Sequence, residues 1–190
     1  MVAIFVCRIE GQQTVVVEVE KYGGIVMFID LLANRSDFVN DVSNMIYKEF
    51  VVNTGSKMTI EEVCIYFSNT NSERFPITLI AIEENECTGT ISLFENDLRE
   101  RAMYKPWLAS LYTKPEHRGK GIGQKLITET IKVVKKLGYK ELYLRTENAS
   151  DYYRDRGWIF VESITDDKGR KIDVFKFDLN TTENHSIKER

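Results

Sequence analysis

The sequence of 190 residues contains few cysteines, few prolines and no excess of positive charge. Its three cysteines, Cys7, Cys64 and Cys87, are odd in number and far apart, so neither a disulfide framework nor a CxxC metal site can be inferred. With 26 basic and 29 acidic residues, the net charge of -3 lacks the positive excess that nucleic-acid binding normally needs. The longest apolar runs fall far below the ~20 residues of a membrane-spanning helix. These absences favour a cytoplasmic protein whose partners include neither nucleic acid nor membranes.

The composition that remains is sufficient for one folded domain. Apolar residues make up 43% of the chain and charged residues 29%, values typical of a globular protein with a hydrophobic core. β-branched runs predict an N-terminal β-hairpin extension over residues 1–24, which either covers the sheet edge of its own domain or pairs with a second subunit. Residues 180–190 are polar and are expected to form a flexible tail. The domain proper is predicted over residues 25–179, in a monomer or a homodimer.

The order of predicted elements favours an α+β fold, with a mixed, mainly antiparallel central sheet flanked by helices. Strands are expected over 25–32, 77–83, 88–94, 107–113, 141–146, 158–163 and 171–179, and helices over 37–50, 59–68, 121–137 and 150–156. Tight connections between neighbouring strands predict antiparallel hairpins. Strands that alternate with helices in the second half imply at least one parallel pair.

The two helices before residue 70 carry recognisable caps and apolar stripes. Ser36 or Asp37 is expected to cap the first helix. Its predicted buried stripe consists of Phe38, Val42, Met45, Ile46 and Phe50. Thr59, with Glu62 three residues later, predicts a capping box at the start of the second helix.

The stretch from residue 111 to residue 126 is the most informative about function. A predicted strand leads into a loop with basic residues and three glycines, and a helix follows. Gly119, Gly121 and Gly123 remove side chains where the backbone must approach a ligand, while Arg118, Lys120 and the helix-start amides attract anions. This arrangement suits a pyrophosphate. It is neither a Walker loop nor a GxGxxG loop, because the Lys-Ser or Lys-Thr pair and the third glycine are missing.

Arg118-x-x-Gly121-x-Gly123 after a strand resembles the coenzyme A binding motif of the GNAT superfamily of acetyl-CoA-dependent N-acetyltransferases. The segment from Tyr152 to Trp158 is similar to a second element of this family, aromatic-Tyr-x-x-x-Gly-aromatic. The order and spacing of the two elements match. The resemblance runs from about residue 25 to residue 179, and residues 1–24 lie outside it.

The resemblance implies that strands 107–113 and 141–146 are parallel and splay apart, with acetyl-CoA in the gap. Main-chain groups of the first strand would pair with the pantetheine arm, and those of the glycine loop would hold the pyrophosphate. Asn148 matches a position that contacts the cofactor in many members, and Tyr153 matches the tyrosine near the thioester sulfur. The implied cofactor-binding residues are Leu111, Tyr112, Thr113, Arg118, Gly119, Lys120, Gly121, Ile122, Gly123, Gln124 and Asn148.

The implied activity is transfer of acetyl from acetyl-CoA to a primary amine of a small molecule or peptide. Transfer would be direct, in a ternary complex, without a metal and with Tyr153 as the catalytic residue that serves the departing thiolate. No motif marks a general base, and Asp97 and Glu147 are the carboxylates predicted to contact the amine acceptor. His117 lies in a charged loop without a partner at metal-ligand spacing and is expected at the surface. The missing base and the unmatched residues 1–24 leave an alternative, a non-catalytic acyl-CoA-binding sensor or interaction module.

Overall fold

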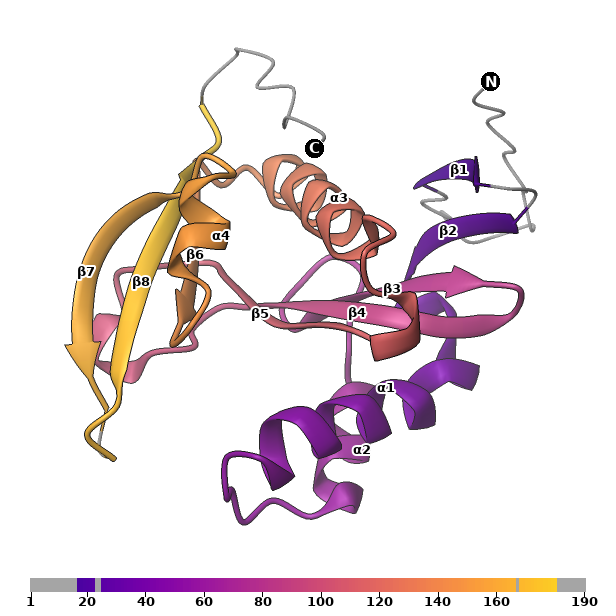
Figure 1. The fold of residues 1–190 in the computed structure, drawn as a ribbon, viewed down its shortest axis with the longest axis horizontal. Coiled ribbons are helices and arrows are strands. Elements are labelled where there is room, and N and C mark those ends of the chain that lie inside the picture. Colours follow the sequence, from indigo (N-terminus) through magenta and orange to yellow (C-terminus); the bar gives the residue numbers. More distant parts are fainter. Residues whose placement is uncertain (1–16, 23–24, 167, 181–190) are drawn as a thin grey trace. The chain divides into compact units, whose positions relative to one another are not determined.

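The computed structural model describes residues 17–22, 25–166 and 168–180 (Figure 1). The chain divides into two compact units, and each has its own core. The first unit comprises the chain up to Leu93 together with Ser110–Thr130, and the second comprises Phe94–Ala109 and the chain from Ile131 on. Both strand β5 (Trp107–Thr113) and helix α3 (Ile122–Lys136) therefore contribute residues to each unit.

The described residues form strands and helices close to the predicted ones. The other strands are β1 (Val17–Tyr22), β2 (Ile25–Leu31), β3 (Ile77–Glu83), β4 (Glu86–Phe94), β6 (Glu141–Thr146), β7 (Ile159–Thr165) and β8 (Lys171–Asp178). The other α-helices are α1 (Val39–Ile46), α2 (Ile60–Ser68) and α4 (Ser150–Arg154). In this part of the chain, no helix has the length and apolar character needed to cross a membrane.

The strand pairing confirms a mixed, mainly antiparallel sheet. In the first unit the strands follow the order β1-β2-β3-β4-β5, with β1 through β4 antiparallel. In the second unit the order is β5-β6-β8-β7, and β8 is antiparallel to both of its neighbours. The predicted parallel pair is β5 with β6, joined at Trp107 opposite Tyr143 and at Leu108 opposite Leu144. Just after this short ladder, Ser110 of β5 has a φ of 54°, which is uncommon for a residue other than glycine.

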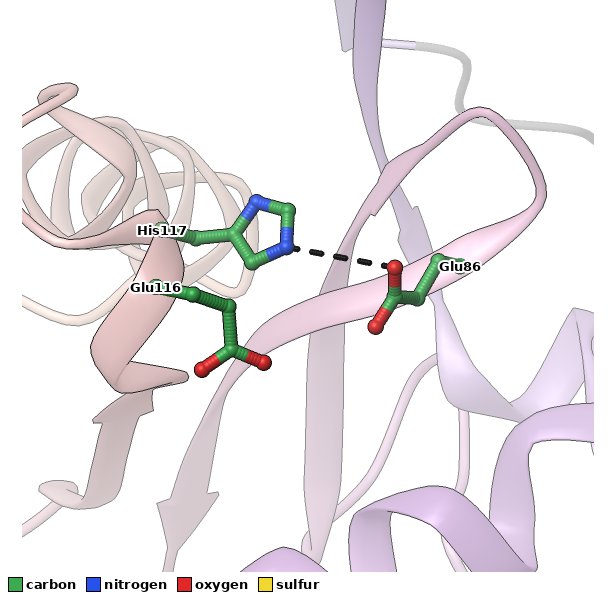
Figure 2. A group of neighbouring side chains, drawn as sticks. All are labelled: Glu86, Glu116 and His117. Carbon is green, nitrogen blue, oxygen red and sulfur yellow. Dashed lines mark ion pairs between the residues drawn. The ribbon is translucent and has the colours of Figure 1, made fainter.

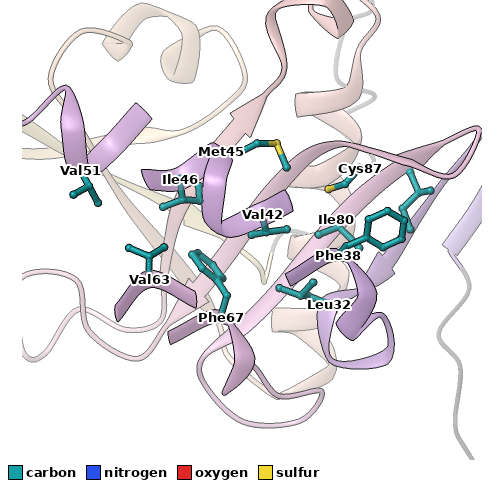
Figure 3. Packing of buried hydrophobic residues seen from close by; sticks show 11 residues of the cluster. Leu32, Phe38, Val42, Met45, Ile46, Val51, Val63, Phe67, Ile80 and Cys87 are labelled. Carbon is teal, nitrogen blue, oxygen red and sulfur yellow. The ribbon is translucent and has the colours of Figure 1, made fainter. Parts of the chain in front are cut away.

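Helices cover both faces of the first unit's sheet. On one face, α1 and α2 pack on β3 and β4 through a buried cluster that includes Val42, Phe67, Ile80 and Cys87 (Figure 3). The first half of α3 lies on the opposite face (Figure 1). This half of the helix comes close to β4 at Gly89, where an added Cβ would lie 3.3 Å from side chains of α3.

The first helical segment differs from the prediction in its cap. A 3₁₀ turn over Ser36–Phe38 precedes α1, so Phe38 takes the N-cap position and makes no side-chain cap hydrogen bond. The expected cap at Ser36 or Asp37 is therefore wrong, because both residues lie inside the preceding turn. Asp37 instead forms an ion pair with Arg35 at 3.1 Å.

The end of this segment also differs from the prediction. The chain from Tyr47 to Val52 is π-helical, and its i→i+5 hydrogen bonds add about one residue to each turn. As a result Val51 is buried, whereas Phe50 is 39% exposed, so the predicted core position of Phe50 is wrong. The capping box of the next helix is confirmed, since Glu62 N donates to Thr59 Oγ1 and Thr59 N to Glu62 Oε2.

At the N-terminal side, β1 pairs with β2 and so covers the edge of its own sheet. This pairing crosses the predicted boundary after residue 24. The first part of the predicted hairpin, residues 1–16, lies outside the described residues, as does most of the predicted tail, residues 181–190. The division of the chain at residues 24 and 179 stays a prediction.

Candidate functional site

The loop between β5 and α3 has a backbone that only glycine adopts easily. Gly119 and Gly121 have φ angles of 76° and 77°, in the left-handed region where other residues are strained. A Cβ added at either position would meet no protein atom within 4 Å, so packing does not explain these glycines. Their left-handed backbone conformation explains why glycine occurs there, and the space beside them is open.

Helix α3 begins directly after this loop. Lys125 N donates to Gly121 O at 3.0 Å in the first turn of the helix. The amides of residues 122–124 precede this bond and point out of the helix start, where the helix dipole is positive. Gly123 lies in this turn, and a Cβ there would stand 3.7 Å from Thr113 Oγ1. The helix start and the end of β5 are thus neighbours within the first unit.

The basic residues of the loop are held near the end of β5. Arg118 Nε donates to Thr113 O at 3.0 Å, and its guanidinium carbon lies 5.7 Å from the ring centroid of Tyr112. Both Arg118 and Lys120 are exposed residues. Lys120 Nζ lies 4.0 Å from a carboxylate oxygen of Glu83 in β3. The structure therefore brings together the residues that were predicted to bind the phosphate end of the cofactor.

Gly89 in β4 is a positioning residue whose role the sequence analysis missed. A Cβ at this position would lie 2.9 Å from Tyr112 O and 3.3 Å from Ile122 Cγ2 and Leu126 Cδ1. Because any larger residue would clash with Tyr112 O, a glycine at position 89 allows β5 and the start of α3 to pack this close to β4. The available signal was a glycine inside a strand rich in β-branched residues, which often marks close approach of another segment.

His117 does not behave as predicted. Its side chain is 15% exposed and its Nδ1 lies 2.8 Å from Glu83 Oε2. Glu86 and Glu116 also offer carboxylate oxygens that lie, with a ring nitrogen of His117, within 4.8 Å of one another (Figure 2). The expectation of a surface histidine without partners at metal-ligand spacing is therefore wrong. A 3₁₀ turn over Pro115–His117 folds the loop back onto the β3–β4 hairpin, a contact that local sequence patterns do not contain.

Tyr153 belongs to the second unit, where α4 places it in an aromatic environment. It is 8% exposed and makes near-perpendicular ring contacts with Tyr152 and Trp158, at centroid distances of 5.2 Å and 5.7 Å. Burial, with a smaller contribution from Tyr152, raises the pKa of Tyr153 to about 12. The phenol therefore keeps its proton at neutral pH and can donate a hydrogen bond.

A buried carboxylate anchors the start of α4. Asp173 of β8 accepts hydrogen bonds from Ser150 Oγ and Ser163 Oγ, each at 2.6 Å. These bonds hold the pKa of Asp173 below its ordinary value. Because Ser150 opens the helix that carries Tyr153, Asp173 helps to position that tyrosine. Sequence analysis gave no signal for this contact, which joins residues 23 positions apart.

The two carboxylates predicted to contact an amine acceptor are both paired with arginines of the second unit. Asp97 Oδ2 lies 2.6 Å from Arg145 Nε, and burial raises the pKa of Asp97 while this pairing opposes the rise. Glu147 Oε1 lies 2.8 Å from Arg170 Nη1. Asn148 is exposed and lies between β6 and α4. The roles of these three residues stay predictions.

A mixed sheet whose parallel strands β5 and β6 are joined along the chain by a glycine loop and helix α3 is the arrangement of an acetyltransferase type of α+β domain. The chain belongs to the acetyltransferase (GNAT) family, whose model matches residues 40–158, more than half of the sequence. The family resemblance inferred from the sequence is confirmed. No curated protein matches the chain.

Solved structures of acetyltransferases share the fold. An aminoglycoside 6'-acetyltransferase type Ii has a TM-score of 0.63 at 18% identity and covers 80% of this chain and 96% of its own. An aminoglycoside 6'-N-acetyltransferase complexed with coenzyme A has the same TM-score and coverages at 15% identity. A Salmonella typhimurium protein with its cofactor acetyl-CoA has a TM-score of 0.60 at 15% identity, over 83% of this chain and 96% of its own. At these identities the likeness shows the fold.

Proposed function

We propose that this protein transfers the acetyl group of acetyl-CoA to a primary amine of a small molecule or peptide. The observation that carries the proposal is the loop between β5 and α3, with two left-handed glycines that leave the backbone open next to a helix start. The family membership supports an acyl transfer. Related folds whose structures contain coenzyme A or acetyl-CoA support the choice of donor.

The phosphate end of the donor fits the first unit. Backbone amides of the segment from Arg118 to Gln124 would hold the pyrophosphate, because amides at a helix start bind anions without a bulky side chain between them. The amide of Arg118 itself donates to Pro115 O at 3.2 Å, so the amides from Gly119 on would make this contact. The exposed cations of Arg118 and Lys120 add charge at the same place. Main-chain groups of Leu111, Tyr112 and Thr113 would pair with the pantetheine arm as an adjacent strand does.

Acetyl-CoA supplies an acyl group that is already activated as a thioester. The acceptor attacks as an uncharged amine, the nitrogen–carbon bond forms and the carbon–sulfur bond breaks. One proton leaves the amine nitrogen and one reaches the sulfur, so the transfer needs no oxidant or reductant. Direct transfer in a ternary complex requires no nucleophilic side chain.

Tyr153 is the residue that we assign to the departing sulfur. Its pKa of about 12 keeps the hydroxyl protonated. A thiol ordinarily titrates near ~8.5, well below this value, so the main contribution is a hydrogen bond that stabilises the developing thiolate. The proton of the amine then reaches the sulfur through this hydroxyl or through water.

The proposal is tested by incubating the protein with acetyl-CoA and a panel of primary amines that includes polyamines, aminoglycosides, amino acids and peptides. Release of the CoA thiol that depends on the amine, with an acetylated product in the mass spectrum, is the expected result. The ion pairs of Asp97 and Glu147 favour a second candidate, a non-catalytic acyl-CoA sensor, because both carboxylates already have cationic partners. Tight binding of acetyl-CoA without release of thiol for any amine would support that second candidate.

A further inference from the structure

Three potential metal ligands meet where the loop before α3 lies against the β3–β4 hairpin. They are Glu86 at the start of β4 and the neighbouring residues Glu116 and His117 of the 3₁₀ turn (Figure 2). Each offers one ligand atom, and these atoms lie within 4.8 Å of one another. All three residues belong to the first unit. We refer to them as the His117 cluster.

The imidazole of His117 is already oriented for a ligand. Its Nδ1 is engaged with Glu83 Oε2 at 2.8 Å, which leaves Nε2 directed toward the other carboxylates. Nε2 lies 3.9 Å from Glu86 Oε2, beyond hydrogen-bond reach. Two ligands that share one tetrahedral Zn²⁺ stand about 3.4 Å apart, since each lies at ~2.0–2.2 Å from the ion. A small movement of exposed glutamate side chains would therefore close the cluster around an ion.

The cluster also has the outer partners that metal sites use. A metal-binding histidine usually directs its second nitrogen to a carboxylate, which fixes the ring, and Glu83 takes this place at 12% exposure. Ligating carboxylates are themselves held, and Lys114 Nζ lies 2.6 Å from Glu86 Oε1, so that Oε2 faces the imidazole. The contacts of Glu83 with His117 and of Lys114 with Glu86 hold two of the three ligands in place, and they are observations separate from the spacing of the ligand atoms.

The charges and donor types indicate which ion fits. Three carboxylates, Glu83, Glu86 and Glu116, surround the imidazole, and two ammonium groups lie beside them, Lys114 at 2.6 Å from Glu86 and Lys120 at 4.0 Å from Glu83. The negative charge therefore exceeds the positive charge, as a cation site requires. Imidazole nitrogen with carboxylate oxygens suits Zn²⁺, whereas Mg²⁺ and Ca²⁺ prefer oxygen ligands alone. We propose that Glu86, Glu116 and His117 bind one Zn²⁺ ion, which ties the loop before α3 to β4. Because its ligands lie outside the chemistry assigned to Tyr153, this site is structural and does not depend on the proposed acetyl transfer.

The test is calorimetric titration of the untagged, EDTA-treated full chain with ZnCl₂, with MgCl₂ in a parallel run. We expect saturable binding of one Zn²⁺, a rise in melting temperature, and no comparable response to Mg²⁺. Glu116→Gln and His117→Asn should each weaken binding by at least about tenfold, and Glu83→Gln by about tenfold to hundredfold. Glu84→Gln, an exposed neighbour in the β3–β4 turn, is the matched control and should bind as the unchanged protein does.

Several results would overturn the site. Equal Zn²⁺ affinity in Glu116→Gln and His117→Asn would place the ion elsewhere on the chain. No saturable Zn²⁺ binding would reduce the cluster to an ion-pair network, and an equal response to Mg²⁺ would contradict the choice of metal. The exposed Glu116 makes its isosteric variant suitable even where a change at His117 affects folding. None of these results bears on acetyl-CoA binding, so the two proposals fail separately.

Discussion

Tyr153 is placed by the packing of its ring. The edge contacts with Tyr152 and Trp158 fix the ring plane, and the resulting burial accounts for most of the rise in its pKa. A hydroxyl on a fixed, buried ring is a preorganised donor, which favours a contribution to the transition state over a contribution to binding. The assignment can therefore be tested by removing the hydroxyl alone.

Tyr153→Phe keeps the ring and its packing and deletes the donor. We predict that kcat falls by about 10²-fold, while KM for acetyl-CoA stays within about twofold. Tyr152→Phe is the matched control, because it changes the adjacent, less buried ring and should leave both constants unchanged. Steady-state kinetics with the best amine of the panel measures both. A kcat equal to that of the unchanged protein would show that Tyr153 serves packing only.

Asp173 makes the stability of the second unit dependent on pH. Its two serine hydrogen bonds hold its pKa below the ordinary 3.8, so the folded state binds fewer protons than the unfolded state as this group titrates. The stabilisation is therefore complete above 3.8 and is lost as pH falls through the lowered pKa. Loss of this contact would release Ser150 at the start of α4.

Asp173→Asn should lower the free energy of unfolding at neutral pH by about 1–3 kcal/mol. It should also remove part of the fall in stability between about pH 5 and pH 2, since the variant has no carboxylate to protonate. Urea unfolding at several pH values gives both quantities. If the free energy of unfolding of the variant falls as steeply with decreasing pH as that of the unchanged protein, other carboxylates cause the loss of stability in acid.

At the scale of elements, the π-helical turn explains why a correct helix prediction gave a wrong core residue. A period of 3.6 residues carries the apolar stripe from Ile46 to Phe50, whereas the wider turn moves the buried position to Val51. Only packing against α2 and β3 shows this shift, because both Phe50 and Val51 are apolar.

Because Val51 rather than Phe50 is buried, truncating the smaller side chain should destabilise the protein more than truncating the larger one. Val51→Ala should destabilise the protein by about 1–3 kcal/mol, because it removes buried methyl groups. Phe50→Ala removes a larger but 39% exposed side chain and should cost less than Val51→Ala. Chemical unfolding of the two variants side by side decides the order. The reverse order would return Phe50 to the core.

The first turn of α3 predicts a conflict between stability and binding. Glycine inside a helix costs about 0.5–1 kcal/mol relative to alanine, and Gly123 has space for a Cβ, whose nearest neighbour would be Thr113 Oγ1 at 3.7 Å. Gly123→Ala should therefore stabilise the free protein by up to this amount. If the pyrophosphate binds at the helix start, the same methyl group should weaken acetyl-CoA binding by at least about tenfold. Chemical unfolding measures the change in stability, and calorimetric titration measures the change in acetyl-CoA affinity. An unchanged affinity for acetyl-CoA would show that Gly123 does not lie in the binding site.

For the whole molecule, the sequence predicted the elements whose signals are local. Strand Glu141–Thr146 and the capping box at Thr59 follow from residue types within a few positions, and the structure confirms both. The parallel pairing of β5 with β6 follows from the helix that connects them. The contact of His117 with Glu83, 34 residues away, and the bridge from Asp173 to Ser150 depend on tertiary structure and were missed.

The candidate site divides in the same way. The left-handed conformations of Gly119 and Gly121 agree with a loop that needs glycine, as the sequence suggested. The arginines that pair with Asp97 and Glu147 could not be predicted, because an ion pair depends on neighbouring strands and loops. A loop that binds a cofactor through its backbone can thus be predicted from its glycines, whereas side-chain contacts to an acceptor cannot be predicted from the sequence in the same way.

The most direct test of the central claim is calorimetric titration with acetyl-CoA of the unchanged protein, Gly121→Val and Gly169→Val. Gly121 and Gly169 have φ of 77° and 76° in open surroundings, so both variants carry a similar backbone strain of about 1–2 kcal/mol. Only Gly121 lies in the loop before α3. We predict tight binding by the unchanged protein and by Gly169→Val, a loss of about 10²-fold or more in Gly121→Val, and much weaker binding of ATP and NAD. No binding of acetyl-CoA by the unchanged protein, or full affinity in Gly121→Val, would contradict the account.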